Sequence, residues 1–156
     1  MLPNPKKQAQ SRACAHLGWV AASNGIPGKR VQQVLEEVGL AADANRRVGT
    51  YSLGMGQWLG LATALLGRPE RLILDEPVNG LDPQGVRWIR RLLRGYADAG
   101  GTVLLSSHLI GELAEIVDDV VIINGGRIKA RGEVADVMAG HPSLEEAFFA
   151  HMEARA

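Results

Sequence analysis

Two short polar segments directly follow apolar runs in this sequence, and they hold the residues best suited to chemistry. Asp75 and Glu76 follow the run 72–74, and Ser-Ser-His at 106–108 follows the run 102–105. Carboxylates are preferred ligands of Mg²⁺, and a second acid can orient or deprotonate water in metal-assisted phosphoryl transfer. The two acids could equally be solvated residues at the end of a strand.

The position of these residues depends on the strands that carry them. The apolar runs 72–74, 102–105 and 120–123 are typical of buried strands, and helical patterns lie between them. Strands that alternate with helices predict an α/β protein with a largely parallel sheet, and runs that are apolar throughout predict cover on both faces. Ligands of open parallel sheets bind at the carboxyl ends of the strands. Both polar segments fall at such ends, although His108 alone could be an ordinary loop histidine.

Helices and turns are predicted from apolar spacing and from Gly, Pro and Asp residues. Residues 1–12 are expected to be irregular, and Asn124-Gly125-Gly126 predicts a hairpin turn that returns through 127–131. One helix should begin at Asp82-Pro83, with the acid as its cap, and end at Gly100-Gly101. The other predicted helices are 13–22, 31–38, 55–66, 109–117, 133–139 and 143–152.

Composition narrows the classes of function. The chain has 156 residues, with 17 basic and 17 acidic side chains, so one domain is expected and a dedicated nucleic-acid binder is disfavoured. The five basic residues among the first thirty, which include Lys29 and Arg30, are interpreted as a solvated face. The single cysteine, Cys14, suits a reducing cytosol, and no apolar run is long enough for a membrane helix. Any membrane role would therefore need a partner.

Four short segments follow one another along the chain: YSLGMGQ at 51–57, LILDEP at 72–77, NGLDPQG at 79–85 and SSHL at 106–109. Together they resemble the second half of an ABC transporter ATP-binding subunit of the drug or antibiotic-peptide exporter type. The resemblance implies the C-terminal part of a RecA-like P-loop NTPase domain with part of the ABC helical subdomain. One partial domain, 1–156, would then hold helical-subdomain residues at about 12–66, a RecA-like part at about 70–140 and a C-terminal helix at about 141–156.

The resemblance assigns the segment 51–57, here called the signature segment, to the family motif LSGGQxQ. In the family this motif contacts the γ-phosphate of ATP held by the opposite subunit. A small hydroxyl residue and a glycine at a helix start expose backbone donors to phosphate, although Ser52 could also be a simple N-cap. Leu53 replaces a family glycine, Met55 replaces a glutamine, and Trp58 stands where arginine is usual and is expected to pack. The matching residues are Ser52, Leu53, Gly54, Met55 and Gln57.

The resemblance also assigns the two polar segments at the strand ends. Asp75 matches the acid that acts on Mg²⁺, usually through water, and Glu76 matches the catalytic base. His108 matches the switch histidine that reads the γ-phosphate. The D-loop, which crosses the dimer seam in the family, corresponds to Asn79, Gly80, Leu81 and Asp82.

A complete subunit also needs a phosphate-binding loop, G-x-x-x-x-G-K-[ST] after a strand. The nearest match, 23–30, has Ser23 for the first glycine and Arg30 for the metal-binding hydroxyl, and it follows a helical pattern. We reject it, and by resemblance the chain starts just after the Q-loop. ATP and Mg²⁺ are then expected as cofactors only with a complementing phosphate loop, and the isolated chain is expected to be inactive.

The resemblance implies an ATP-binding component that couples ATP hydrolysis to export. Its partners would be a second ATP-binding subunit and a transmembrane permease, with no nucleic acid, and the permease would hold it at the cytoplasmic face of the membrane. One alternative is an inactive regulatory module that offers Ser52 and Gly54 to an intact subunit. Another is the C-terminal half of an SMC-type ATPase, although no sustained heptads precede Ser52.

Overall fold

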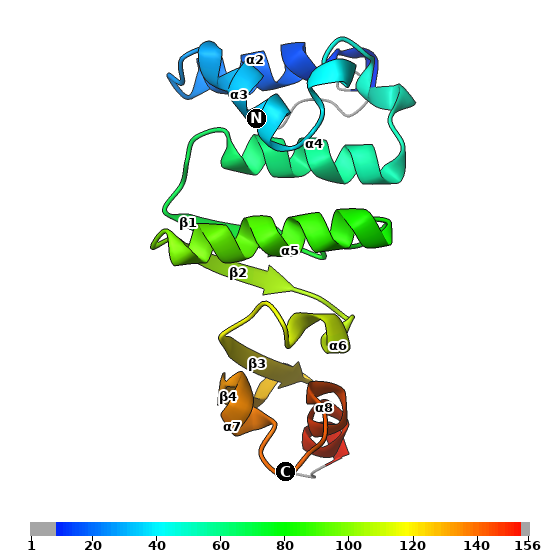
Figure 1. The fold of residues 1–156 in the computed structure, drawn as a ribbon, viewed down its shortest axis with the longest axis vertical. Coiled ribbons are helices and arrows are strands. Elements are labelled where there is room, and N and C mark those ends of the chain that lie inside the picture. The colour runs from blue at the N-terminus through cyan, green and yellow to red at the C-terminus, as the bar shows by residue number, and fades with distance from the viewer. Residues whose placement is uncertain (1–8, 154–156) are drawn as a thin grey trace. The chain divides into compact units, whose positions relative to one another are not determined.

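The computed structural model describes residues 9–153, apart from the side chains of residues 112 and 113. The predicted irregular segment 1–12 therefore lies mostly outside the described residues. The chain divides into a first compact unit that ends at Ser106 and a second that begins at Ser107. Figure 1 identifies the elements of both units. Across the described residues, no helix has the length and apolar content that a membrane crossing requires.

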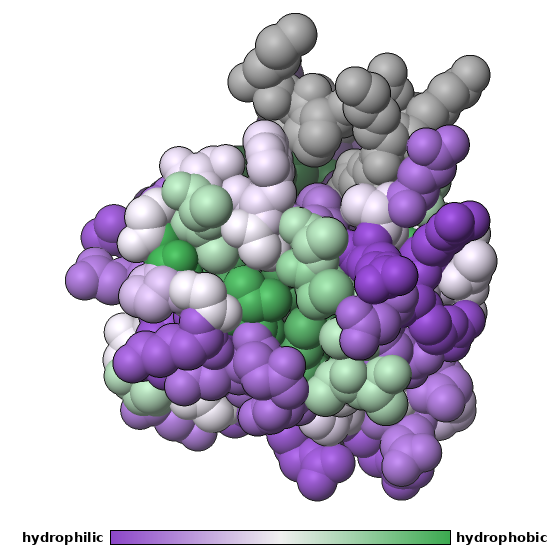
Figure 2. Space-filling view, turned by 90° about the horizontal axis from the view of Figure 1, so that it is seen from above, coloured by the Kyte–Doolittle hydropathy of each residue, from purple (hydrophilic) through white to green (hydrophobic). Residues whose placement is uncertain are grey.

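Three helices form the N-terminal part of the first unit: α2 (Ala13–Ser23), α3 (Lys29–Glu37) and α4 (Leu53–Leu65). Short 3₁₀ turns, η1 (Ala41–Asp43) and η2 (Val48–Thr50), lie between α3 and α4. All three helices were predicted, and in α3 the apolar residues recur at helical spacing. Their buried positions meet in one core, to which they contribute Ala13, Leu17, Ala21, Val31, Val34, Leu35, Leu59, Leu61, Ala62 and Leu65. Figure 2 looks down on this end and shows hydrophilic residues around a smaller hydrophobic area.

Arg30 is buried, with 7% of its surface exposed, so its interpretation as part of a solvated face is wrong. Its guanidinium donates to the carbonyls of Leu65 and Leu66, at 3.0 and 3.2 Å, and pairs with the carboxylate of Glu37. The carbonyls at a helix C-terminus lack intrahelical partners, and the several donors of one arginine satisfy two of them here. Arg30 thus closes the end of α4, which agrees with rejecting 23–30 as a phosphate loop.

A β-α-β arrangement completes the first unit. Strands β1 (Arg71–Asp75) and β2 (Thr102–Ser106) are parallel, and α5 (Pro83–Asp98) connects them. The Asp82 carboxylate accepts a hydrogen bond from the Gly85 amide at 2.7 Å, so the predicted cap of α5 is confirmed. The register pairs the last residues of the two strands and brings their carboxyl ends together.

Only one face of this two-stranded sheet is covered. Leu72 is buried, but Ile73 and Leu104, which are register partners, are 76% and 62% exposed. Successive side chains of a strand point to opposite faces, and the helices of this unit pack on the side that Leu72 shares. The expectation that both faces are covered is therefore wrong for the described residues.

The second unit has its own small core. Strands β3 (Asp119–Asn124) and β4 (Arg127–Glu133) form an antiparallel hairpin whose turn glycines have φ of +56° and +72°. Such left-handed conformations favour glycine, which explains why the predicted hairpin is confirmed. Helices α7 (Val134–Val137) and α8 (Leu144–Glu153) bury apolar residues against it.

Two expectations for the second unit need correction. The helix predicted at 109–117 is shortened to α6 (Ile110–Leu113), because β-branched Ile116 and Val117 lower helix propensity before β3. The strand predicted at 120–123 is present and pairs antiparallel with β4, as the predicted hairpin requires, but Val121 and Ile123 are more than half exposed. Its apolar run therefore does not mark a strand buried on both faces.

Candidate functional site

The candidate acids lie at the carboxyl end of β1. Asp75 is its last residue and is the register partner of Ser106, the last residue of β2. The Ser106 hydroxyl donates to the Asp75 carboxylate and accepts from the Glu76 amide at 3.1 Å. The Ser106 carbonyl also accepts from that amide, at 3.2 Å. The strand end predicted from sequence is thus confirmed, and the carboxylate of Asp75 lies at the surface there.

Glu76 has a left-handed backbone, with φ of +48°. A residue with a Cβ pays roughly 1–2 kcal/mol for this conformation, and such strain is concentrated at functional sites. The conformation is supported by hydrogen bonds on both sides, because the Glu76 amide donates to Ser106 and its carbonyl accepts from the Asn79 amide at 3.1 Å. The chain therefore turns sharply after β1 and leads directly into the D-loop.

The D-loop, residues 79–82, connects this turn to α5. Gly80 has φ of +76°, a conformation that suits glycine. The Leu81 amide donates to the carbonyl of Val78 at 3.2 Å, and Asp82 then caps the helix. The residue types of the D-loop are thus explained locally by the turn and the cap, whatever further role they have.

The signature segment forms the start of α4. Ser52 has an extended backbone, and its hydroxyl accepts from the Met55 amide at 3.2 Å, so its role as an N-cap is confirmed. The first-turn amides of a helix point outward and carry the positive end of its dipole. Leu53 is 68% exposed at this end. The arrangement is chemically suited to an anion.

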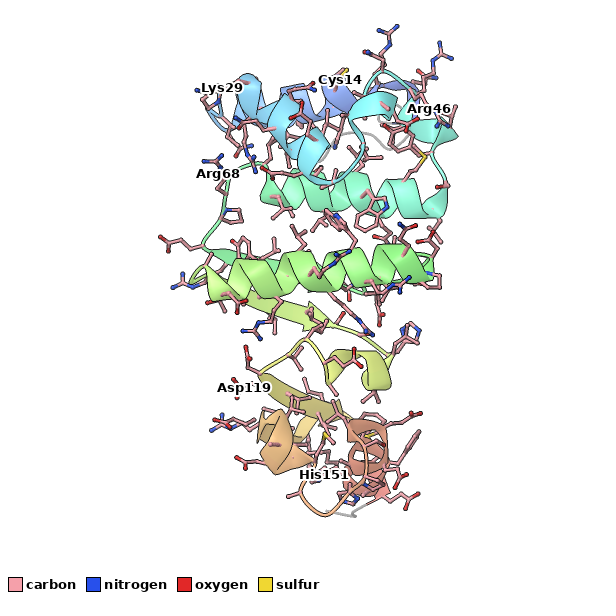
Figure 3. The ribbon with its side chains drawn as sticks, viewed as in Figure 1. Cys14, Lys29, Arg46, Arg68, Asp119 and His151 are labelled. Atoms are coloured by element: carbon pink, nitrogen blue, oxygen red, sulfur yellow. The ribbon has the colours of Figure 1, made fainter. Side chains whose placement is uncertain are left out.

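Arg46 braces the signature segment, and sequence reasoning missed it. Its guanidinium donates to the Asp43 carboxylate at 2.7 Å and to the Thr50 carbonyl at 3.1 Å, and it lies 5.8 Å from the ring centroid of Tyr51. Figure 3 shows the labelled side chain near the start of α4. Burial, and secondarily the charge of Asp43, raises the pKa of the Tyr51 phenol, which donates to the Asp43 carbonyl. Nothing in the local pattern marks an arginine for this position.

The signature segment and the D-loop of the same chain are in contact. A methyl group added to Gly80 would lie 2.7 Å from Cγ of Leu53, and one added to Gly54 would lie 3.4 Å from the Gly80 carbonyl oxygen. Further along α4, Gln57 lines a hollow of about 210 Å³ together with Asp75. The fold thus brings together three of the four motifs that the sequence presents separately.

Trp58 packs between α4 and α5, as expected. Its ring meets the ring of Trp88 edge to face, and a methyl group added to Gly85 would lie 3.1 Å from Cζ2 of Trp58. The replacement of an arginine by tryptophan at this position therefore adds apolar contact between the two helices.

The fourth motif begins with Ser106, the last residue of the first unit, and its other residues belong to the second unit. His108 follows Ser107, whose hydroxyl accepts from the Leu109 amide at 3.0 Å and shapes the turn. The histidine side chain is exposed.

The first unit fits a magnesium nucleotide better than a fully protein-bound metal. Among the described residues, no group of three or more His, Cys, Asp or Glu side chains is arranged to hold a metal ion. Mg²⁺ usually keeps several waters and binds one or two carboxylates together with substrate phosphates. The Asp75 carboxylate at an open strand end meets that requirement.

A β-α-β unit with acids at a strand end, beside a capped helix start, is typical of α/β proteins that bind ligands at the carboxyl ends of their strands. Residues 24–114 match the profile of a family described as "AAA domain, putative AbiEii toxin, Type IV TA system", and the chain belongs to this AAA-domain family.

Its homologues among curated proteins are ATP-binding proteins of ABC transporters. It is 48% identical over 99 residues to the bacitracin transport ATP-binding protein BcrA of Bacillus licheniformis, covering 63% of this chain and 32% of the relative. It is 46% identical over 110 residues to the ABC transporter ATP-binding protein YcbN of Bacillus subtilis, covering 70% and 36%. The lantibiotic transport ATP-binding protein SrtF of Streptococcus pyogenes is 37% identical over 124 residues, covering 80% and 52%. The chain thus spans about a third to a half of these relatives.

Solved structures agree with this relationship. An "ATP binding subunit of ABC transporter" superposes with a TM-score of 0.83 at 27% identity, over 93% of this chain and 64% of that one. The ATP-binding cassette MJ1267 gives a TM-score of 0.71 at 20% identity, over 94% and 65%. The α/β RecA-like P-loop fold and the resemblance to ABC ATP-binding subunits are therefore confirmed.

Proposed function

We propose that this chain forms the signature, D-loop and acidic part of the ATP-binding component of an ABC exporter. The observation that carries the proposal is the contact of the signature segment with the D-loop, in the same unit in which Asp75 and Glu76 follow β1. The resemblance to bacitracin and lantibiotic transport proteins supports an antibiotic-peptide exporter. The proposed domain consists of a helical part at about 12–66, a RecA-like part at about 70–140 and a C-terminal helix at about 141–156.

In this proposal the two acids have different tasks. Asp75 holds Mg²⁺, directly or through water, and Glu76 is the general base for the attacking water. Mg²⁺, when bound, neutralises charge on the phosphates. The left-handed backbone of Glu76 and the hydrogen bond from its amide to the Ser106 hydroxyl hold the glutamate in place at the end of β1.

The remaining site residues act on the γ-phosphate. His108 contacts it from the chain's own side, and the start of α4 contacts the γ-phosphate of ATP held by a second ATP-binding subunit. The backbone amides and the dipole of α4 supply the attraction, for which Ser52 sets the helix start. The proposed contact residues are Ser52, Leu53, Gly54, Met55 and Gln57.

Transport requires partners. We propose a dimer with a second ATP-binding subunit, across a seam that includes the D-loop, and a transmembrane permease that holds the pair at the inner face of the membrane. Because Arg30 is occupied in closing α4, residues 23–30 offer no phosphate cradle. The chain by itself is therefore proposed to hydrolyse no ATP, and to do so once a phosphate-loop segment complements it.

A chimera tests this function. The matched 99-residue segment of the Bacillus licheniformis relative is replaced by that of this chain, so that the relative supplies its remaining residues. We expect magnesium-dependent ATP hydrolysis by the chimera and none by the 156-residue chain. Glu76→Gln should abolish turnover in the chimera while nucleotide still binds. Lost binding with retained hydrolysis would contradict the role of Glu76, and turnover by the isolated chain that Glu76→Gln removes would refute the need for a complementing segment.

The same chimera tests the phosphate contacts. Ser52→Arg places bulk at the start of α4, and His108→Ala removes the histidine, so each should lose most of the activity. Ser23→Arg, at the exposed end of α2, is the matched control for added bulk and should keep it. Wild-type rates in both site variants would mean that these segments are structural only.

A further inference from the structure

Ser106, the last residue of β2, links the carboxyl end of β2 to that of β1 through its hydroxyl. In the sequence it is the first residue of the polar segment 106–108. Its hydroxyl contacts the side chain of Asp75 and the backbone of Glu76 at the same time. Both neighbours are residues that the proposed function assigns to metal binding and to water activation.

The direction of each hydrogen bond follows from the groups involved. An amide N–H can only donate, so the Ser106 oxygen accepts from Glu76, at 3.1 Å. An ionised carboxylate can only accept, so the single hydroxyl proton of Ser106 points to Oδ1 of Asp75. A serine hydroxyl has one proton and two lone pairs, and this arrangement uses the proton and one lone pair. The rotation of the hydroxyl is therefore determined by its two partners.

The parallel register makes this bridge specific. Asp75 and Ser106 are register partners on the neighbouring strands β1 and β2. Directly after this pair, Glu76 takes its left-handed conformation, with φ of +48°. Because that conformation is unfavourable for a residue with a Cβ, contacts on either side must hold it, and the two acceptors of Ser106 hold its amide.

We propose that Ser106 is a positioning residue, which aligns the Asp75 carboxylate with the backbone of Glu76 so that both acids face one bound nucleotide. This inference rests on the proposed function for the identity of the reaction. The hydrogen-bonded bridge itself does not depend on it. Ser106→Thr should keep the bridge, since threonine retains the hydroxyl and suits a strand.

The first measurement uses the 156-residue chain and backbone amide exchange observed by NMR. Ser106→Ala removes the hydroxyl acceptor of the Glu76 amide and leaves the carbonyl acceptor, so exchange of that amide should accelerate by roughly threefold, near the lower end of the net value of one hydrogen bond. Exchange at Ile89, buried in α5, should stay within about twofold, since the core is untouched. Thr102→Ala, at the opposite end of β2, is the matched control. Unchanged exchange at Glu76, or equal acceleration at Glu76 and Ile89, would overturn the proposal.

The second measurement uses the chimera and separates kcat from KM. Ser106→Ala should lower kcat for ATP about tenfold with little change in KM, and Ser106→Thr should recover most of it. A wild-type kcat in Ser106→Ala, or a threonine variant as slow as the alanine variant, would overturn the positioning role. If the parent chimera has no ATPase, the proposed function fails, while the exchange result still decides whether Ser106 positions Glu76.

Discussion

Trp58 and Trp88 meet edge to face, with ring centroids 4.8 Å apart and ring planes at 84°. Trp58 belongs to α4, which begins with the signature segment, and Trp88 belongs to α5, which the D-loop caps through Asp82. Aromatic pairs of this geometry contribute about 0.5–1.5 kcal/mol beyond their buried area. The pair therefore ties the helix that carries the signature segment to the helix that carries the D-loop.

Removal of the Trp58 ring should destabilise the first unit. Trp58→Ala deletes the contact with Trp88 and the packing on Gly85, so we expect a loss of about 3 kcal/mol in the free energy of unfolding, measured in urea. Trp19→Ala is the control, because Trp19 is 54% exposed on α2 and its loss should cost less than about 0.5 kcal/mol. Equal costs for the two variants would contradict a structural role for the pair.

The contact of Leu53 with Gly80 can be measured by a mutant cycle. Gly80→Ala should cost about 1 kcal/mol for its positive φ and up to about 1 kcal/mol more for crowding against Leu53. Gly39→Ala is the matched control, since Gly39 has φ of +73° and open space around it. In a Leu53→Ala background, Gly80→Ala should cost no more than Gly39→Ala. A cost that Leu53→Ala leaves unchanged would mean that Leu53 has room to move aside.

The uncovered face of β1 and β2 should make the isolated chain self-associate. Ile73 and Leu104 lie directly across from each other and are mostly exposed, and an exposed apolar patch favours association with another chain. The double variant Ile73→Thr, Leu104→Thr should lower the mean mass in sedimentation, whereas Trp19→Ala should not. A wild-type monomer that melts cooperatively above about 60 °C would rule out this expectation.

His16 should make stability depend on pH. Burial lowers its pKa below the ordinary value of 6.5, so the unfolded chain binds a proton at a higher pH than the folded chain does. The free energy of unfolding should therefore fall as pH drops from above 6.5 through the lower pKa of the folded state. His16→Gln should lose less stability over that interval in urea titrations. An identical pH slope in both proteins would show that His16 titrates alike when folded and unfolded.

Local features could be predicted from the sequence because short-range groups produce them. Ser52 and Asp82 cap helices through amides three residues ahead, and the hairpin turn at Gly125-Gly126 needs only two residues with positive φ. The helix predicted at 109–117 is longer than α6, because the apolar residues alone do not show that β-branched residues lower helix propensity before β3. The roles of the acids came from resemblance, because a carboxylate pair after an apolar run is compatible with several functions.

Contacts between distant segments were decided by the tertiary structure alone. Arg30 is buried where it donates to two carbonyls at the end of α4, 35 and 36 positions away, and no local sequence pattern indicates these contacts. Ile73 and Leu72 are both apolar, yet one is exposed and one buried, since the pleat sends them to opposite faces and the described helices pack on one face. Ser106 meets Asp75 because the register of two parallel strands aligns them. The sequence by itself determined which elements form and where they are capped, whereas their register and packing determined which side chains meet.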